Sequence, residues 1–307
     1  MSIRMGFGVA GFPFSGPGAF FEWVDLLEAS ATDSIWFSER LVSSQPTLEP
    51  MAAMALLAGR TKRLKFGMNA IVLPFRDPLV LAKECATLDY LSDGRLLPVF
   101  GVGSDIAPEF RATGSNTVGR GPKSDEMLDI MARLWSDEGP VNYEGTYFHY
   151  ANAMISPRPK QQPLPIWIGG SSEAAIRRTA RVGTGWLAGL QSPAQVRPVV
   201  ASIRTASAAA GRPLDEDHYG AGFSYRLGSW DEPVAQKAAA QFARIPGAPS
   251  SAAYIAVGSA ADIVARAREY VEAGISKFVV RPIAEGDAEI MQQTKRLIEE
   301  VMPLVHG

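Results

Sequence analysis

The sequence predicts an α/β protein built as a single (β/α)8 TIM barrel over residues 1–307, with rim insertions. Eight apolar runs of strand length alternate with segments of helical periodicity, and Gly, Pro, Asp or Ser stands at most turns between them. No change of composition marks a linker between domains. Alternation of this kind is typical of a parallel sheet, and eight units favour a barrel over a doubly wound sheet.

The predicted strands are short apolar runs that stop at Gly, Pro or polar residues. They occupy residues 3–10, 34–38, 64–73, 95–102, 165–168, 185–190, 218–227 and 277–280. The fourth contains Pro98, which cannot donate a ladder hydrogen bond, so we expect a bulge there. The predicted helices place apolar residues three and four apart. They occupy residues 20–31, 48–60, 78–91, 120–135, 173–182, 194–210, 260–272 and 287–301.

Two insertions interrupt the alternation and are predicted to lie on the barrel rim. Residues 141–150 are rich in Val, Tyr, Thr and Phe around Glu144-Gly145, which predicts a β-hairpin within an insertion near 136–164. A second insertion, near 229–252, is poorly periodic apart from residues 233–243. Its Pro- and Gly-rich segment 246–249 suggests a mobile rim loop.

Composition excludes several classes of protein. The formal net charge is −2, which gives no electrostatic reason to expect nucleic acid or an anionic membrane as a partner. No apolar run approaches the roughly 20 residues of a membrane span. The first residues lack the apolar core of a signal peptide, so we expect a cytoplasmic protein. Cys85 is the only cysteine and stands in a helical pattern, which indicates a small core residue.

One strand-to-helix turn has the chemistry of an anion site. Gly169 and Gly170 end an apolar run, and a helical pattern follows at once. Ser171 or Ser172 can cap this helix, and Glu173 in its first turn suits the helix dipole. Free N–H groups at such a turn can bind a phosphate. An ordinary strand-to-helix turn fits these residues equally well.

Other nucleotide and hydrolase motifs are absent. Gly101-Val102-Gly103 lacks the third glycine of a dinucleotide fingerprint, because Ile106 stands there. The sequence contains neither a Gly-Lys-Ser/Thr phosphate loop nor a Gly-x-Ser-x-Gly elbow. These classes of enzyme are therefore not expected.

Metal and Schiff-base chemistry are not expected either. His149, His218 and His306 are far apart, and we find no acidic or cysteine partner at ligand spacing, so we predict no metal site. Lys277 begins its strand, at the wrong end for a Schiff-base aldolase. Trp36 and its counterparts on other strands are interpreted as barrel packing.

Several segments together support a resemblance to a known family. They are Asp33-Ser34-Ile35-Trp36, Asp77-Pro78 with its helix, 88–96 (LDYLSDGRL), Gly101-Val102-Gly103, 165–172 (PIWIGGSS) and 257–259 followed by 272–274. Over nearly the whole chain, and in this order, they resemble the bacterial luciferase-like monooxygenase superfamily. The resemblance implies a barrel that binds FMN or the deazaflavin coenzyme F420, and the compact length is more similar to the F420-type and small FMN-type members.

The resemblance also implies where the cofactor binds. Gly169, Gly170 and Ser171 would hold its phosphate, in agreement with the chemistry of the turn. The end of the third strand matches a family bulge, so we expect a cis peptide bond between Asn69 and Ala70, behind the flavin ring.

A second stretch matches the segment that runs beside the ring and ribityl chain in this family. It consists of Val102, Gly103 and Ser104, where the lack of side-chain bulk would let a cofactor approach.

The sequence departs from the family pattern at two positions. Many F420-type members carry His where this chain has Arg40, and arginine keeps its proton, so acid catalysis there is in doubt. Glu39 remains a candidate, and we expect the catalytic residues to be Glu39 and Arg40. Some carry an acid where this chain has Ser104, with Asp105 next to it. Arg281, at the end of the eighth strand, could bind a substrate or cofactor anion, or could be a solvated or salt-bridged arginine.

The resemblance therefore implies a flavin-type oxidoreductase acting on a small organic substrate at the C-terminal mouth of the barrel. With FMN it would use O₂ to oxygenate the substrate, and with F420 it would transfer hydride without O₂. A non-catalytic or degenerate flavin-binding barrel is the alternative. The family commonly forms homodimers, and the exposed apolar side chains of the helix at 79–91 are compatible with this.

Overall fold

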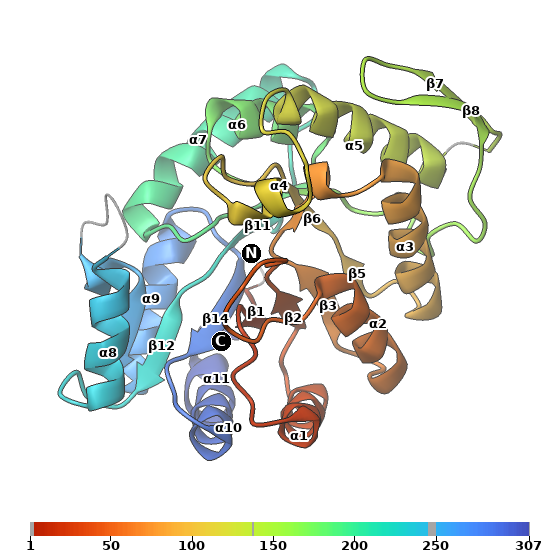
Figure 1. Cartoon of the computed structure of the whole chain (residues 1–307). Helices are drawn as coiled ribbons and strands as arrows, with labels where there is room; N and C mark the ends of the chain where they lie inside the picture. The colour runs from red at the N-terminus through yellow and green to blue at the C-terminus, as the bar shows by residue number, and fades with distance from the viewer. Residues whose placement is uncertain (1–2, 137, 245–249, 307) are drawn as a thin grey trace.

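The computed structural model describes residues 3–136, 138–244 and 250–306, and shows a curled parallel sheet with helices around it. Figure 1 shows the strands in the middle of the molecule and the helices outside them. In this part of the chain no helix combines the length and the apolar character needed to cross a lipid bilayer.

The sheet is made of twelve parallel strands. They are β1 Arg4–Val9, β2 Ser34–Phe37, β3 Lys65–Met68, β4 Ile71–Val72, β5 Leu96–Leu97, β6 Val99–Gly101, β9 Trp167–Gly169, β10 Gly185–Leu187, β11 Tyr219–Ala221, β12 Ser224–Leu227, β13 Ile255–Gly258 and β14 Lys277–Pro282. One series of neighbours runs β14, β1, β2, β3, β5, and the other runs β14, β11, β10, β9, β6, β4. β12 pairs with β13 and with the end of β14.

Several helices begin directly after a residue whose side chain caps them. The helices are α1 Pro17–Glu28, α2 Pro50–Arg60, α3 Pro78–Leu91, α4 Pro108–Ala112, α5 Arg120–Ser136, α6 Glu173–Val182, α7 Pro193–Ala209, α8 Pro233–Phe242, α9 Ala260–Glu272, α10 Asp287–Arg296 and α11 Met302–His306, with 3-10 turns at Leu73–Phe75 and Ser251–Ala253 and a π turn at Leu297–Val301. The Asp77 carboxylate accepts from the first amides of α3, and Ser259 caps α9 in a capping box. Both caps were predicted.

The structure differs from the predicted elements in several places. The third, fourth and seventh strands are each split, at Asn69-Ala70, at Pro98, where proline interrupts the ladder as expected, and at Gly222-Phe223. The prediction of eight strands missed β13, because four apolar residues are too few to show a period. The prediction also missed α4, because a five-residue helix carries little periodicity.

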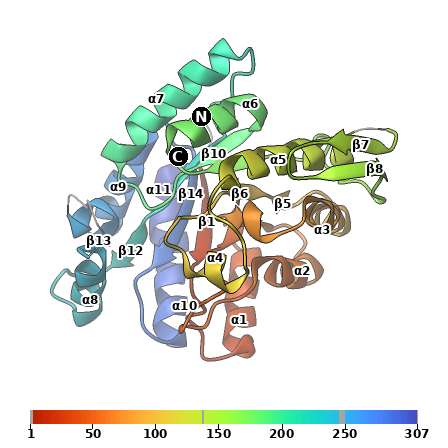
Figure 2. The same cartoon turned by 45° about the horizontal axis from the view of Figure 1, so that its top comes forward.

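The predicted hairpin is confirmed. β7 Val141–Glu144 pairs antiparallel with β8 His149–Ala153, and the two views agree that this hairpin projects outward beyond α5 (Figures 1 and 2). The predicted mobile segment at 246–249 lies outside the described residues.

Large side chains fill the inside of the sheet, as predicted. Trp36 and Trp167 pack there with Leu187 and Val279, and both indoles are almost completely buried. The strand beside Trp36 carries Gly67, where a Cβ would lie 2.4 Å from the carbonyl oxygen of Leu97 and 2.7 Å from the indole. Glycine is therefore required at this position. Cys85 is also buried, and its burial raises the pKa of the thiol.

We expect Gly67→Ala to lower the free energy of unfolding by about 1–3 kcal/mol, because the added methyl group must displace the Trp36 ring or the backbone. The matched control is Gly59→Ala in α2, where a Cβ meets nothing within 4 Å. There the same change should raise stability by about 0.5–1 kcal/mol through helix propensity. Urea unfolding monitored by circular dichroism measures both, and equal effects at the two positions would contradict the packing argument.

Candidate functional site

The predicted site residues lie at one edge of the sheet. Because the strands are parallel, their C-terminal ends gather on the same side. Residues from the ends of β2, β3, β6, β9 and β14 meet there, although they come from five distant parts of the sequence. We call this side the C-terminal edge.

Three small residues come together at the C-terminal edge. The peptide bond between Asn69 and Ala70 is cis, as the resemblance implied. A Cβ added at Gly169 would lie 3.5 Å from the Cβ of Ala70, and one added at Gly101 would lie 3.7 Å from the same atom. The ends of three strands therefore form a surface with almost no side-chain bulk, which a flat ring could approach.

The turn after β9 has the geometry of an anion site. Gly170 has a φ of +100°, and its carbonyl oxygen accepts a hydrogen bond from Trp186 Nε1 at 2.7 Å. Ser172 caps α6 by accepting from the amide of Ala175 at 3.2 Å. Ser171 is exposed, and its amide donates no hydrogen bond within the described chain. A free amide beside a helix N-terminus attracts an anion.

We expected an open surface along the segment after β6, but the structure packs other side chains against it. Gly103 has a φ of +72°, but a Cβ there would lie 2.9 Å from Val72 Cγ1 and 3.0 Å from the Phe110 ring. The missing side chain thus makes room for Phe110 of α4. Val102 is half-buried and Ser104 is exposed beside it.

Glu39 lies in a buried network of charges. Its carboxylate accepts from the amide of Val72 at 2.7 Å and forms an ion pair with Arg76, and its side chain is only 1% exposed. Arg76 also bonds Glu49 at 2.9 Å. Burial raises the pKa of Glu39, in opposition to the lowering effects of Arg76 and the Val72 amide. Glu39 thus holds the strand end after the Asn69-Ala70 bulge in place.

Arg40 points toward a different partner. Its guanidinium lies 3.7 Å from the carboxylate of Glu109, and its side chain is 58% exposed whereas that of Glu109 is 4% exposed. The structure therefore brings Arg40 to α4 and Glu39 to Arg76, so that neighbouring residues join separate charge pairs.

Arg281 is half-buried and forms no salt bridge with a described residue. It lines a pocket of about 370 Å³ with residues 8–13, Gln45, Pro46 and Ala284. Its Nε is buried, and the side chain has no hydrogen bond or ion pair with any described residue. Burial alone lowers its pKa. A Cβ at Gly8 would lie 2.8 Å from this Nε, so glycine there makes room for the guanidinium.

Sequence reasoning missed Arg76, Glu109 and Phe110. Arg76 directly precedes the predicted cap at Asp77, so its position at a strand end could have been noticed. Glu109 and Phe110 lie on the helix that the sequence pattern did not predict, and only the fold brings them over the strand ends.

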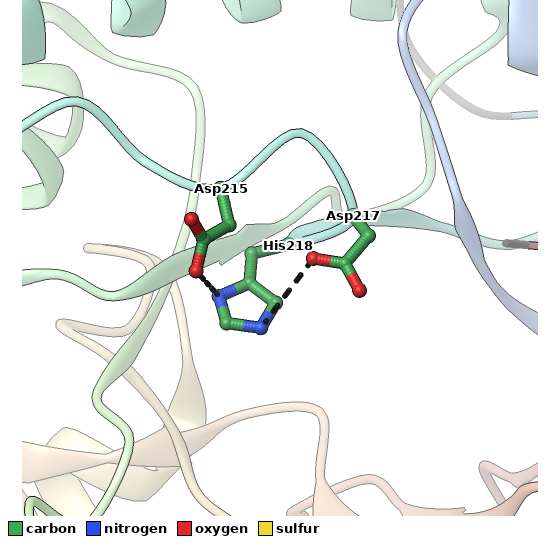
Figure 3. A group of neighbouring side chains, drawn as sticks. All are labelled: Asp215, Asp217 and His218. Atoms are coloured by element: carbon green, nitrogen blue, oxygen red, sulfur yellow. Dashed lines mark ion pairs between the residues drawn. The ribbon is translucent and has the colours of Figure 1, made fainter. Parts of the chain in front are cut away.

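The prediction that the histidines lack acidic neighbours is wrong for two of them. His149 Nδ1 lies 2.8 Å from the Glu144 carboxylate, and His218 also has acidic neighbours. Asp215 and Asp217 flank it, with contacts of 3.9 Å and 3.7 Å to its two ring nitrogens (Figure 3). One ligand atom from each of the three residues lies within 4.8 Å of the others. The prediction considered spacing between histidines and overlooked adjacent aspartates. This group precedes β11 and so lies at the N-terminal edge, away from the residues described above.

Comparison with known proteins supports the family. The model for luciferase-like monooxygenases matches residues 8–272. An F420-dependent glucose-6-phosphate dehydrogenase of Microbacterium testaceum is 32% identical over 196 residues, which are 60% of this chain and 56% of that protein. The chain spans less than two thirds of the length of the curated relatives it matches.

Solved structures share the fold. An F420-dependent secondary alcohol dehydrogenase, in complex with an F420–acetone adduct, has a TM-score of 0.85 and 17% identity over 100% of both chains. The oxygenating constituent of 3,6-diketocamphane monooxygenase from Pseudomonas putida, in complex with FMN, has a TM-score of 0.76 and 18% identity over 99% of both chains. At such identities the likeness concerns the fold alone.

The chain belongs to the luciferase-like monooxygenase family. Members of this family are enzymes that use FMN or F420.

We expect Glu39→Gln to change how stability depends on pH. The raised pKa means that the folded protein holds this proton more tightly than the unfolded chain does. The stability that the folded protein gains by holding this proton is therefore present below the ordinary glutamate pKa of 4.5. This stability is lost as pH rises through the raised pKa. As pH rises above 4.5, the variant should therefore lose less unfolding free energy than the wild type.

Urea unfolding at several pH values measures this difference. Glu22→Gln, an exposed glutamate on α1, is the matched control and should leave the pH dependence unchanged. Parallel curves for the wild type and Glu39→Gln would contradict the burial argument.

Proposed function

We propose that this protein is a flavin-type oxidoreductase that uses reduced FMN or coenzyme F420 on a small organic substrate at the C-terminal edge. The observation that carries the proposal is the small-residue surface of Ala70, Gly101 and Gly169 beside the free amide of Ser171. A flat ring and a phosphate need these two features next to each other. Family membership supports the same class of reaction.

The residues at this edge fit either cofactor. Gly169, Gly170 and Ser171 would hold the phosphate through backbone amides, and Asn69 and Ala70 would lie behind the ring. The bound cofactor supplies the redox chemistry, either oxygenation with O₂ or hydride transfer.

The segment after β6 completes the proposed cofactor site. Val102, Gly103 and Ser104 would line the edge of the ring and ribityl chain, with Phe110 fixing the backbone of Gly103 from behind.

The two residues expected to be catalytic have different roles in this proposal. Arg40 keeps its charge and, being exposed, would attract anionic groups to the edge. Glu39 can exchange a proton, but its carboxylate is held by Arg76 and by the Val72 amide. We therefore propose that Glu39 positions the strand end behind the ring, with its raised pKa leaving proton exchange available to it.

Arg281 would bind an acidic group of the substrate. A half-buried guanidinium whose Nε is buried without a partner carries a desolvation cost, which an anion in the 370 Å³ pocket would offset. Carboxylate and phosphate both match its planar donor geometry. The proposed substrate class is therefore a small organic acid or phosphate ester.

The proposed fold is one closed barrel domain with rim insertions. Strands β5 and β6 are separated only by Pro98, and they pair with β3 and β9 respectively, which supports closure of the sheet into one eight-stranded barrel domain over 1–307. The hairpin and the segment near 229–252 would be its rim insertions. Exposed Val80, Tyr90 and Leu91 on α3 support a homodimer.

A non-catalytic flavin-binding barrel is the second candidate. It is favoured by Arg40 and Ser104, which replace the family's proton-transfer groups. Turnover decides between the two. Cofactor binding without oxidation or reduction across a panel of organic acids and alcohols would support the second candidate.

We expect F420 or FMN to bind with saturation in an ultraviolet–visible titration, and Gly170→Ala to weaken binding about tenfold or more. Alanine is strained at a φ of +100°, so the turn that presents the Ser171 amide must shift, and losing one such hydrogen bond costs about 1–3 kcal/mol. Gly211→Ala carries a comparable strain at a φ of +69° after α7 and should leave affinity unchanged. Binding of neither cofactor would overturn the proposal.

We expect Arg281→Gln to raise KM for acidic substrates at least tenfold with a smaller change for neutral ones, because a charged hydrogen bond contributes about 1.5–3 kcal/mol. Arg268→Gln, at an exposed position on α9, is the matched control and should change neither. An equal rise of KM for acidic and neutral substrates would show that Arg281 does not recognise charge.

A further inference from the structure

A second cavity opens at the N-terminal edge of the sheet, opposite the proposed active site. Its volume is about 560 Å³, within the range of small-molecule sites. It lies where β1, β3, β11 and β14 begin. The side chains that matter for its chemistry are Arg4, Lys65, Arg212, Lys277, Trp167 and His218.

Positive charge exceeds negative charge around this cavity. Lys277 and Lys65 share one carboxylate, Asp33, at 2.5 Å and 3.7 Å. Arg4 pairs with Asp217 at 2.7 Å. Arg212 bonds only backbone carbonyl oxygens, and no carboxylate of a described residue lies within 4 Å of it. Two cationic groups thus remain without a carboxylate of their own.

Lys277 lies at the inner end of the cavity. Its side chain is 1% exposed, and its ammonium lies 5.6 Å from the centre of the Trp36 ring. Burial lowers the pKa of Lys277 to about 8, and repulsion from Arg4 and Lys65 adds to this against the attraction of Asp33. The single carboxylate of Asp33 therefore does not neutralise the positive charges of both Lys277 and Lys65.

Apart from Asp33, which pairs with Lys277 at the buried end, the acidic residues named here lie toward the rim of the cavity. One oxygen of Asp217 accepts a hydrogen bond from Arg4, and His218 Nδ1 lies 2.8 Å from the carbonyl oxygen of Thr184. Asp215 is the one lining carboxylate and is 79% exposed, so water screens its charge. Lys277 and Asp33 form an ion pair at the buried end, so Lys65 and Arg212, nearer to solvent, are the cations that lack a carboxylate of their own.

We propose that this N-terminal cavity is a binding site for the phosphoryl group of a small molecule. The anion would lie between Lys65, Lys277 and Arg212, where it supplies the missing negative charge, and the volume leaves room for an organic group beside Trp167. Lysine and arginine at the end of a cavity are the usual partners of phosphate. The inference is independent of the proposed function, since no residue is shared between the two sites.

Isothermal titration of the whole protein without FMN or F420, with inorganic pyrophosphate as probe, tests the proposal. We expect saturable binding that Lys65→Gln weakens at least tenfold and Arg212→Gln weakens severalfold. Both side chains are partly or fully exposed, so the fold should survive. Lys62→Gln, an exposed lysine outside the cavity, is the matched control and should have no effect.

Two results would overturn the proposal. One is the absence of saturable binding, or an equal loss with Lys65→Gln and Lys62→Gln. The other is binding that Gly170→Ala abolishes while Lys65→Gln leaves it intact, because the probe would then occupy the turn after β9. Cofactor titrations of Lys65→Gln report separately on the proposed function, which this variant should not disturb.

Discussion

The structure depends on how indole rings fill the inside of the curled sheet. The Trp36 ring packs against Gly67, and the Trp167 ring packs against Gly185. A Cβ at Gly185 would lie 2.3 Å from the Trp167 ring. A strand can approach each ring only because its facing residue has no side chain. Placing a large ring opposite a glycine lets neighbouring strands pack closely and fills the inside of the sheet.

Parallel pairing then separates the molecule into two chemically different edges. At the C-terminal edge, glycine and alanine leave a surface of backbone, and the charged groups Glu39 and Arg76 are paired behind it. At the N-terminal edge, Lys277 and Asp33 occupy the buried end of a polar cavity. The packed interior separates the two sets of charges. The pKa values in each set therefore depend on the residues at its own edge.

Both edges contain a cation that is withdrawn from water and lacks a full set of partners, half-buried Arg281 at one and buried Lys277 at the other. Arg281 has none among the described residues, and Lys277 shares its single carboxylate with Lys65. Desolvation makes such arrangements unfavourable in the empty protein, and an anion is the simplest group that offsets the cost. Stability and ligand binding are therefore linked at these positions, since an anion that binds only the folded state also stabilises it.

The sequence by itself determined the order of the parallel strands and helices, the caps at Asp77 and Ser259, and the turn at Gly170, because these features depend on residues within one or two turns of each other. The cis bond at Asn69-Ala70 was reached through family resemblance and not from local chemistry.

Only the tertiary structure decided which charges meet. Glu39 and Arg76 are 37 positions apart by their numbers, Asp33 and Lys277 are 244 apart, and the missed α4 supplies Glu109 to Arg40. Local patterns contain no information about such long-range pairs. The burial of each pair, and with it the direction of each pKa shift, depends on the whole packed fold.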